Sequence, residues 1–583
     1  MKVKTLTVGM VGSGGDGVVA SGEMVLGAVA QEGLYALSTK SFGAQIRGGE
    51  SSMRVRIATE PVEHTGSGLD YLIVLNWSDY HKFCGELNVK PEGVILYEAD
   101  PKVAIEPVPE GLKARAVVPV EMQKLADQSG AKRAKNVLTL GILSGLANIN
   151  HDTFKKSIEK KFGRKGDDVL GINLKAFQAG FELAKSLRED AWPELQYDKA
   201  KPKMLVDGNW AIAAAAVAAG VEVFSGYPIT PSTEVMQWLT THLPKFGGRL
   251  LQAEDEIAAM GIVCGASFAG AKAMTTTSGP GMSLKSELIG MATMAELPCV
   301  IVNVQRGGPS TGVPTKGEQS DLYQALFSAH GDAPRPVLAA YDVVNAIDMV
   351  FEAFNIAETY QTPTILLSDG FLAQGKQVCD LPDLSNKKRF PVAHRKTPTD
   401  AELKEGYKRF KKTADHISPM AKLGTEGGSY LASGITHDEV GKPVGDAKIH
   451  HDMNIKRIEK LAPLRKRDDL VLVMGDKDAK DAVITWGYSV GAVKQAVQDL
   501  RDEGKKIKLI VPLLIAPLPT EAFNKALKGI EKLAVVELNY QGQMANYLRM
   551  ELDLPKTFKV NRSGGCVWQP AEVVMRLKES LFA

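Results

Sequence analysis

The chain alternates short apolar runs with longer amphipathic stretches, a pattern that predicts β-strands and α-helices in turn. Residues 4–11 predict a strand that ends in a glycine-rich loop, and residues 17–31 predict the helix that follows it. The apolar run at residues 71–77 predicts a further strand. Because alternating strands and helices are typical of α/β folds, we expect an α/β domain over residues 1–190.

A polar stretch with a Trp-Pro pair at residues 188–203 indicates a linker. The alternation then resumes and continues to residue 370, which predicts a parallel sheet whose ligands lie at the carboxyl ends of its strands. The loops GYPITPSTE, TSGPG and QRGGPSTG follow three of the expected strands. We therefore expect a second domain at residues 203–375, with its ligand site in these loops.

The last third of the chain divides into two parts. Residues 376–468 are rich in Pro, Lys and His and have little periodicity, which favours an extended arm over a separate core. From residue 470 the apolar runs LVLVMG, AVITWG, KLIVPLL and LAVVELN predict strands, with helices expected at 489–503 and 522–527. We expect a last α/β domain at residues 469–583, and thus a multidomain α/β protein.

Composition excludes several classes of function. The 583 residues are 44% hydrophobic and 24% charged, and 70 basic against 68 acidic residues leave a net charge of +2. No strong field therefore draws the chain to nucleic acid or to an anionic membrane. The apolar run at 210–224 is shorter than the roughly 18 residues that span a bilayer. The five cysteines never form CxxC, so we expect no metal cluster on this chain, and a soluble, cytoplasmic protein.

The loop after the first expected strand contains the spacing GxGxxG at Gly12, Gly14 and Gly17, with Gly15 between them. Between a strand and a helix, such glycines let backbone amides approach a pyrophosphate. The acidic residue that NAD-binding loops carry about 20 positions later is missing from residues 34–40, which disfavours NAD. A coenzyme A or other phosphate site and a tight turn that only packs the helix on the sheet both remain open.

A basic segment follows at residues 40–56, where Lys40, Arg47 and Arg54 surround a Gly-Gly turn. A guanidinium beside small residues can hold a phosphate with two hydrogen bonds, although an exposed basic hairpin explains the pattern equally well. Together with the glycine loop, this segment resembles the gamma subunit of 2-oxoacid:ferredoxin oxidoreductases. That resemblance implies a domain that handles coenzyme A.

Three later segments, at residues 207–236, 253–287 and 305–322, resemble the alpha subunit of the same family and occur in the same order. The resemblance continues through residues 484–496 and 535–549. It is greatest to 2-oxoglutarate enzymes whose gamma domain is fused ahead of alpha. The resemblance implies a gamma-like α/β domain, a thiamine-enzyme pyrimidine-binding domain and a transketolase C-terminal-like domain.

The chemistry of thiamine explains why such a domain needs a sheltered carboxyl group. The cofactor becomes a nucleophile when its aminopyrimidine turns to the imino tautomer, and a carboxyl group on the opposite ring nitrogen promotes that change. By resemblance the activating glutamate is Glu256. Its neighbours Glu254 and Asp255 are rivals, and all three could simply favour a helix N-terminus through its dipole.

The resemblance also assigns substrate and cofactor contacts. Thr230, in a loop stiffened by prolines, is expected near the substrate carbonyl, and Arg306 is expected to pair with the 2-oxoacid carboxylate. For Arg306 a plain surface arginine is the alternative. The glycines around Pro280 let backbone approach the cofactor, although tight packing requires the same residues. The expected cofactor contacts in this domain are Tyr227, Pro228, Ile229, Gly279 and Pro280.

The resemblance implies partners as well. No Gly-Asp-Gly with a downstream Asn pair anchors magnesium and diphosphate, and no cysteine cluster carries electrons. A beta subunit should therefore supply the Mg²⁺ and diphosphate site and a 4Fe-4S iron–sulfur cluster, within a dimer of gamma-alpha/beta protomers that reduces ferredoxin.

The expected reaction joins 2-oxoglutarate and coenzyme A to give succinyl-coenzyme A and CO2, or runs in reverse. Alternatives are pyruvate or another 2-oxoacid, a non-redox thiamine-dependent decarboxylase or transketolase-type enzyme, and a nucleotide-binding dehydrogenase or scaffold built on the glycine loop.

If the N-terminal domain handles coenzyme A, Arg47→Ala should raise the KM for coenzyme A more than the KM for the 2-oxoacid, because a phosphate contact is lost. Steady-state kinetics of the assembled enzyme measure both constants. The opposite ordering would remove coenzyme A from this domain.

Overall fold

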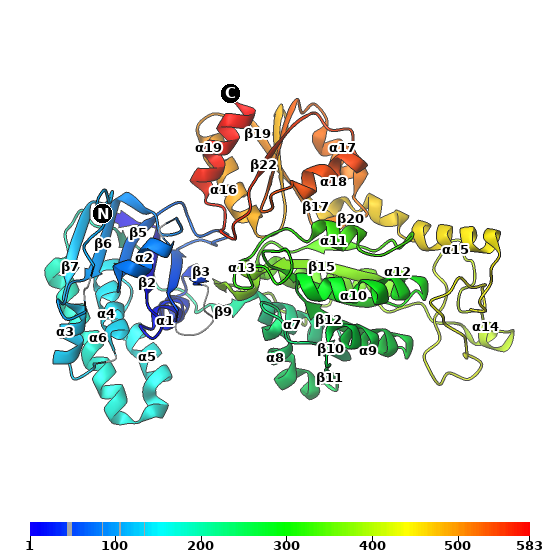
Figure 1. Ribbon diagram of the computed structural model, residues 1–583, viewed down its shortest axis with the longest axis horizontal. Helices are drawn as coiled ribbons and strands as arrows, with labels where there is room; N and C mark the ends of the chain where they lie inside the picture. Colours follow the sequence, from blue (N-terminus) through cyan, green and yellow to red (C-terminus); the bar gives the residue numbers. More distant parts are fainter. Residues whose placement is uncertain (44–48, 84, 104–105, 133) are drawn as a thin grey trace. The chain divides into compact units, whose positions relative to one another are not determined.

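The computed structural model describes residues 1–583 except 44–48, 84, 104–105 and 133, and the chain divides into two compact units (Figure 1). The first unit contains Met1–Asp207, Gln374–Leu381 and Gln569–Glu572. The remaining segments, Gly208–Ala373, Pro382–Trp568 and Val573–Ala583, form the second unit. Each unit combines sheets with covering helices, which confirms the expected multidomain α/β fold class.

The first unit is built on an eight-stranded sheet that contains the strand expected near the start of the chain. In sheet order its strands are β7 (Ala116–Val120), β6 (Val89–Glu98), β5 (Leu69–Val74), β2 (Thr5–Gly12), β4 (Ser51–Ala58), β3 (Tyr35–Phe42), β16 (Lys376–Cys379) and β9 (Met204–Asp207). Strands β2, β5, β6 and β7 are parallel, whereas β4, β3, β16 and β9 pair antiparallel.

Helices cover both faces of this sheet. Successive side chains of a strand point to opposite faces, so strands with apolar side chains at successive positions present an apolar surface on each side that must be buried. Met10 and Ile73 belong to the larger apolar core, whereas Val11 and Val74 belong to the smaller one. The larger core is completed by α1 (Val18–Gln31), α4 (Lys135–Ala147), α5 (His151–Phe162), α6 (Asp167–Leu187) and α3 (Met122–Gln128), and the smaller by α2 (Trp77–Phe83). A short 3₁₀ helix, Gly163–Lys165, links α5 to α6.

The stretch expected to be a linker is instead packed into the first unit. Trp192 is only 3% exposed and belongs to the larger core, and the backbone carbonyl of Pro193 accepts a hydrogen bond from the Tyr71 hydroxyl at 2.6 Å. Strand β8 (Glu194–Leu195) then pairs with β1 (Lys2–Val3). Trp192 and Leu195, two apolar residues within this polar stretch, are buried in the larger core, and burying an apolar side chain stabilises by about 1.5–3 kcal/mol.

The second unit contains a seven-stranded sheet in the order β11 (Arg249–Gln252), β10 (Val223–Gly226), β12 (Ala273–Thr277), β13 (Cys299–Gln305), β15 (Pro363–Asp369), β14 (Val337–Ala339) and β20 (Leu514–Ala516). Neighbouring strands are parallel except for the antiparallel pair β14 and β20. Helices α9 (Glu256–Phe268) and α10 (Gly279–Met294) pack on each other, and α7 (Gly208–Ala218) packs against α8 (Thr233–His242) and α12 (Val343–Tyr360). Shorter helices are Leu243–Phe246, α11 (Leu322–Phe327) and α13 (Gly370–Gln374).

A five-stranded sheet in the same unit carries the strands expected near the C-terminus, in the order β17 (Val471–Gly475), β19 (Ile507–Pro512), β18 (Asp481–Thr485), β21 (Lys532–Glu537) and β22 (Lys556–Asn561). Only β17 and β19 are antiparallel neighbours. The associated helices are α16 (Ser489–Asp502), α17 (Thr520–Leu527), α18 (Gln543–Glu551) and α19 (Pro570–Leu581).

Residues 382–446 contain little regular structure and lie along the second unit (Figure 1). A buried ion pair anchors them: the Arg395 guanidinium donates to both carboxylate oxygens of Glu358 on α12, at 2.9 and 2.6 Å. It also donates to the carbonyls of Ser267 and Ala271, each at 2.9 Å. All the strong donors of this arginine are therefore used to attach the arm to the sheet domain.

The arm contains α14 (Asp400–Lys404) and is followed by α15 (Ala447–Glu459) and the 3₁₀ helices Ala462–Lys466 and Asp468–Leu470. Among the described residues, no helix has both the length and the apolar character needed to cross a bilayer.

Replacing Arg395 with alanine should lower the free energy of unfolding of the second unit by roughly 3–5 kcal/mol, because the buried Glu358 loses its partner. Calorimetric melting of the chain measures the change. Arg389→Ala is the matched control, since Arg389 pairs with Asp348 on the same helix at 3.2 Å but both side chains are well exposed. An exposed pair contributes only about 0–1 kcal/mol. Equal melting temperatures for the two variants would contradict the anchoring role.

Candidate functional site

The parallel strands β11, β10, β12 and β13 are neighbours in the sheet, so their carboxyl ends meet at one edge. The segment leading to Glu256 follows β11, the loop with Thr230 follows β10, the turn at Gly279 follows β12, and Arg306 follows β13. Figure 1 shows β11, β10 and β12 side by side, with α9 beside them. The sheet thus gathers the residues that the sequence placed in three separate motifs.

Glu256 is the first residue of α9 and is only 6% exposed. Its two rivals have other environments. The carboxylate of Asp255 caps the helix by accepting the Ala258 amide at 2.7 Å, and Glu254 is exposed. Among the three acidic residues, Glu256 is therefore the one whose side chain is sheltered.

The Glu256 side chain lies directly against the backbone at the start of α10. A β-carbon on Gly281 would stand 2.7 Å from both Cγ and Oε1 of Glu256, and 2.1 Å from the hydroxyl oxygen of Thr277. Real β-carbons do not approach other atoms so closely, so only glycine fits at this position. Gly281 thereby allows the carboxyl group to sit at the edge of the sheet.

A buried lysine that no sequence pattern indicated contacts the main chain of Glu256. The Lys285 ammonium group on α10 donates to the backbone carbonyl of Glu256 at 2.9 Å, and the lysine is fully buried. Burial lowers the pKa of Lys285 to about 8, opposed by attraction to Glu256 and Asp255. Glu256 is therefore contacted by α10 through both its side chain and its main chain.

Arg306 is buried at the end of β13, which removes the surface-arginine alternative. Its Nη1 donates to the carbonyl of Thr230 at 2.7 Å, while its Nε lies buried with no hydrogen-bond acceptor. Burial lowers the pKa of Arg306, opposed by the negative charges of Asp321 and Glu256. The guanidinium thus has a donor left for an anion. It also lies close enough to Glu256 for the two charges to attract each other.

The loop after β10 presents its residues to solvent. Tyr227 is 40% exposed, Pro228 and Thr230 are exposed, and Ile229 is half-buried. The amide of Ser232 donates to the Ile229 carbonyl at 2.8 Å, which closes a turn.

The buried Asn209 on α7 fixes the far side of this loop by donating to the Pro231 carbonyl at 2.7 Å. The loop is therefore held in shape while its outer face stays accessible.

Asp321 is a further polar residue of this edge that the sequence analysis did not single out. It accepts a hydrogen bond from the Asn303 amide at 3.1 Å, and its carboxylate lies 3.2 Å from where a β-carbon of Gly279 would stand. Burial raises the pKa of Asp321 to about 6, opposed by the Asn303 hydrogen bond and the charge of Arg306. The only sequence signals were the polar residues Asn303 and Gln305 within a largely apolar strand.

In the first unit, the glycine loop follows β2 and leads into α1. Gly15 and Gly17 have φ values of 104° and 74°, in the left-handed region that favours glycine. A β-carbon on Gly17 would stand 2.6 Å from the Asn136 amide, and one on Gly12 would stand 2.8 Å from the Asp16 carboxylate. These contacts explain three of the four predicted glycines by backbone geometry and close packing; Gly14 lies in the turn between them.

Asp16 stabilises this loop from inside. Its carboxylate accepts the Ser13 amide at 2.9 Å and lies 3.5 Å from the Lys135 ammonium group. A carboxylate already occupies one backbone amide of the loop, so these contacts agree with the tight-turn interpretation. They leave the phosphate role a prediction.

The basic residues of the segment at 40–56 lie in different environments. Lys40 lies on β3, at the same end of the sheet as the glycine loop, because Lys40 pairs with Met53 and Met53 with Met10. Arg54 is buried and donates to backbone carbonyls of its own domain, at 2.9 Å for Thr65. Arg47 lies outside the described residues.

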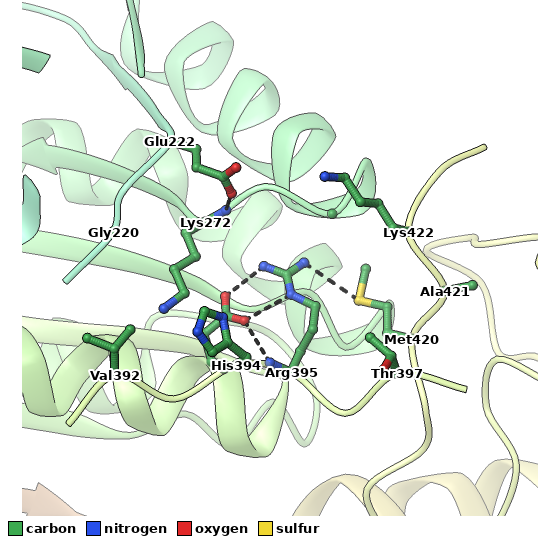
Figure 2. Close-up of a pocket in the computed structure, with 12 residues that line it drawn as sticks. Gly220, Glu222, Lys272, Val392, His394, Arg395, Thr397, Met420, Ala421 and Lys422 are labelled. Carbon is green, nitrogen blue, oxygen red and sulfur yellow. Dashed lines mark hydrogen bonds and ion pairs between the residues drawn. The ribbon is translucent and has the colours of Figure 1, made fainter. Parts of the chain in front are cut away.

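A cavity of about 450 Å³ opens at the opposite edge of the seven-stranded sheet, where Lys272 directly precedes β12 (Figure 2). The buried Lys272 ammonium group donates to the carbonyls of Ala219 and Ala393, at 3.2 and 2.7 Å. Figure 2 shows the Arg395 guanidinium beside this cavity with its ion pair to α12. The buried charges here attach the arm and lie apart from Glu256.

Four cysteines, Cys264, Cys299, Cys379 and Cys566, carry free thiols. Within the described ranges, no three His, Cys, Asp or Glu side chains gather in an arrangement that could hold a metal ion.

Three family descriptions match successive parts of the chain. Residues 7–183 match pyruvate ferredoxin/flavodoxin oxidoreductase. Residues 214–456 match the thiamine diphosphate-binding domain of pyruvate flavodoxin/ferredoxin oxidoreductase, and residues 479–573 match pyruvate:ferredoxin oxidoreductase core domain II. The fold and the site therefore define a multidomain oxidoreductase chain with a thiamine diphosphate-binding domain.

Relatives narrow this class. The 2-oxoacid:ferredoxin oxidoreductase subunit alpha of Saccharolobus solfataricus is 32% identical, over 95% of this chain and 94% of its own length. The 2-oxoglutarate synthase subunit KorA of Methanocaldococcus jannaschii is 35% identical, over 63% of this chain and 97% of its own length. A solved 2-oxoglutarate:ferredoxin oxidoreductase from Magnetococcus marinus, with 2-oxoglutarate, coenzyme A and succinyl-CoA bound, is 40% identical. It matches with a TM-score of 0.92, over 99% of this chain and 100% of that one.

The chain belongs to the family of 2-oxoacid:ferredoxin oxidoreductase alpha subunits. The resemblance stated from the sequence motifs is thereby confirmed, and the family is one of multi-subunit ferredoxin-dependent enzymes. A nucleotide-binding dehydrogenase or scaffold and a non-redox thiamine enzyme do not explain these matches.

Gly281→Ala should displace the Glu256 side chain, because the added β-carbon meets Thr277 and Glu256 at impossible distances. A 1 Å misplacement of a reacting group can cost roughly 10²-fold in rate, so turnover of the assembled enzyme should fall by about that factor. Gly265→Ala in α9 is the matched control, since its β-carbon would meet nothing within 4 Å. A Gly281 variant as active as the Gly265 variant would show that the close packing has no role in the reaction.

Proposed function

We propose that this chain is the fused gamma-alpha subunit of a 2-oxoglutarate:ferredoxin oxidoreductase. The enzyme converts 2-oxoglutarate, coenzyme A and two oxidised ferredoxins to succinyl-coenzyme A, CO2, two reduced ferredoxins and a proton, or runs in reverse. The observation that carries this proposal is the convergence of Glu256, Thr230 and Arg306 at one edge of the parallel sheet. The substrate is supported by the likeness to the Magnetococcus marinus enzyme.

The residues at this edge fit thiamine diphosphate. Gly281 removes the side chain that would otherwise displace the Glu256 carboxyl group, and Gly279 leaves room for the Asp321 carboxylate. When bound, the cofactor supplies the carbon nucleophile and the electron sink that decarboxylation of a 2-oxoacid requires. Glu256 holds and exchanges a proton at the edge of the sheet, where a sheltered carboxyl group is suited to general acid–base work.

Arg306 binds the carboxylate next to the reacting carbonyl, because a guanidinium with unused donors forms two parallel hydrogen bonds with a carboxylate. Its hydrogen bond to the Thr230 carbonyl places the Thr230 side chain close to the same substrate. Tyr227, Pro228 and Ile229 form the accessible outer face of this loop and contact the cofactor. Together these residues orient substrate and exclude water from one side.

The N-terminal domain handles coenzyme A in this proposal, through the glycine loop at Gly12, Gly14, Gly15 and Gly17 and through Lys40 and Arg47. Support comes from the position of Lys40 at the same end of the sheet as this loop. The proposed domains lie at residues 1–190, 203–375 and 469–583, with an arm at 376–468. The first unit of the structure extends beyond these bounds, since Glu194–Leu195 and Lys376–Cys379 pair with its strands.

A beta subunit completes the site in this proposal. It carries Mg²⁺, the diphosphate-binding residues and the iron–sulfur cluster that passes electrons to ferredoxin, and two gamma-alpha/beta protomers form a dimer in the cytoplasm. Support comes from the family, whose relatives are themselves described as subunits.

The proposal is tested by co-purifying the chain with its beta partner and measuring coenzyme A-dependent viologen reduction. Pyruvate, 2-oxoglutarate, branched-chain and aromatic 2-oxoacids are compared at equal concentration. We expect the highest kcat/KM with 2-oxoglutarate, iron in the complex, and no reduction without coenzyme A. A higher kcat/KM with pyruvate would show that the proposed substrate, 2-oxoglutarate, is wrong. A complex without iron would contradict the redox reaction.

Glu256→Gln should lower turnover by roughly 10²- to 10⁴-fold, the usual contribution of a general acid–base group. The substitution keeps size and hydrogen-bonding capacity, so assembly and cofactor content should stay near wild type. The exposed Glu254 provides the control, since Glu254→Gln should change stability by only about 0.3–1 kcal/mol and turnover little. The reverse ranking of the two variants would move the activating role two residues upstream.

A further inference from the structure

We propose that Lys285 is a positioning residue for Glu256: its ammonium group ties the first residue of α9 to α10 and holds the main chain that carries the carboxyl group. This inference rests on the proposed function, because it concerns how the proton-handling glutamate is held.

The geometry starts from the spacing on α10. Gly281 and Lys285 are four residues apart, so they lie one above the other on the same face of that helix. Gly281 admits the Glu256 side chain to within contact of the helix backbone. One turn later, Lys285 donates to the Glu256 carbonyl at 2.9 Å. A single helix face therefore determines where both ends of Glu256 lie.

Lys285 is a buried cation whose hydrogen bond is to the main chain of Glu256. The side chain is 0% exposed, and removing an ammonium group from water is costly unless it is well paired. Among the described residues, its one hydrogen bond is to the Glu256 carbonyl. An apolar residue of similar length would fill the same space without the desolvation cost. Lys272 is also buried against backbone carbonyls, so the acceptor distinguishes the two lysines: Lys285 holds the main chain of Glu256 itself, which gives it a role in positioning.

The charges that face Lys285 identify that role. Both groups that attract it, Glu256 and Asp255, belong to the start of α9, and they oppose the effect of burial on the pKa of Lys285. Glu256 in turn attracts Arg306 from the loop after β13. Glu256 is thus attracted by two buried cations, Lys285 on α10 and Arg306 in the loop after β13.

The test compares Lys285→Met with Lys272→Met in the complex with the beta subunit. Lys272 is the matched control because it is also buried and donates to backbone carbonyls, but lies at the opposite edge of the sheet (Figure 2). Each variant is assayed for melting temperature, for kcat and KM with 2-oxoglutarate, and for the rate of deuterium exchange at C2 of bound thiamine diphosphate. The exchange is measured without substrate, so it reports on Glu256 independently of turnover.

We expect Lys285→Met to slow C2 exchange and lower kcat by about 10- to 100-fold, as for a misplaced reacting group, while KM changes little. Lys272→Met should lower the melting temperature and leave C2 exchange and kcat near wild type. If Lys285→Met does not assemble, Lys285→Gln takes its place in the comparison. Because glutamine keeps a donor but is shorter and has no charge, we expect C2 exchange and kcat to fall less than for Lys285→Met but still more than for Lys272→Met.

Wild-type C2 exchange in the Lys285 variants, with only a loss of stability, would overturn the positioning role. That outcome is distinct from failure of the proposed function, in which the wild-type complex itself would neither bind thiamine diphosphate nor oxidise 2-oxoglutarate. Such a failure would overturn this inference as well.

Discussion

The close contact between the Glu256 side chain and the backbone of α10 at Gly281 is the constraint on which the rest of the site depends. It requires glycine at one position, brings α9 and α10 together at their N-termini, and fixes a carboxyl group at the carboxyl edge of the sheet. The parallel register of β11, β10, β12 and β13 places the other loops around that point. A carboxyl group held by packing in this way keeps one position without needing its own hydrogen-bonding partners.

The two edges of the same sheet use buried cations differently. At the carboxyl edge, Arg306 retains a buried Nε without an acceptor, so a binding group is left available. At the amino edge, Arg395 uses its donors on Glu358 and on backbone carbonyls, and it attaches the arm. An unused donor alone does not mark a binding site, because the fully buried Arg409 also has donors without acceptors. Arg306 is distinguished by its hydrogen bond to the exposed loop that contains Thr230.

Much of the fold could be predicted from periodicity, because strands such as Cys299–Gln305 and Pro363–Asp369 contain apolar runs and are separated by helical patterns. The sheltered position of Glu256 follows from the order of the motifs along parallel strands.

Long-range pairing could not be predicted in the same way. Strand Lys376–Cys379 joins the sheet of the first unit, at the start of a segment expected to be an arm, and Trp192 docks a stretch expected to be a linker. Lys285 gave no signal, because a lysine on a helix usually faces solvent. Its burial follows only from the packing of α10 on α9.

In our proposal this chain supplies one half of a thiamine diphosphate site, so the binding of that cofactor to each subunit and to their complex is the decisive measurement. Thiamine diphosphate with Mg²⁺ is titrated by calorimetry into the isolated chain, into the beta subunit, and into their complex. We expect no tight binding of thiamine diphosphate to the isolated chain and one cofactor bound per gamma-alpha chain in the complex. Stoichiometric binding by the isolated chain would contradict this proposal.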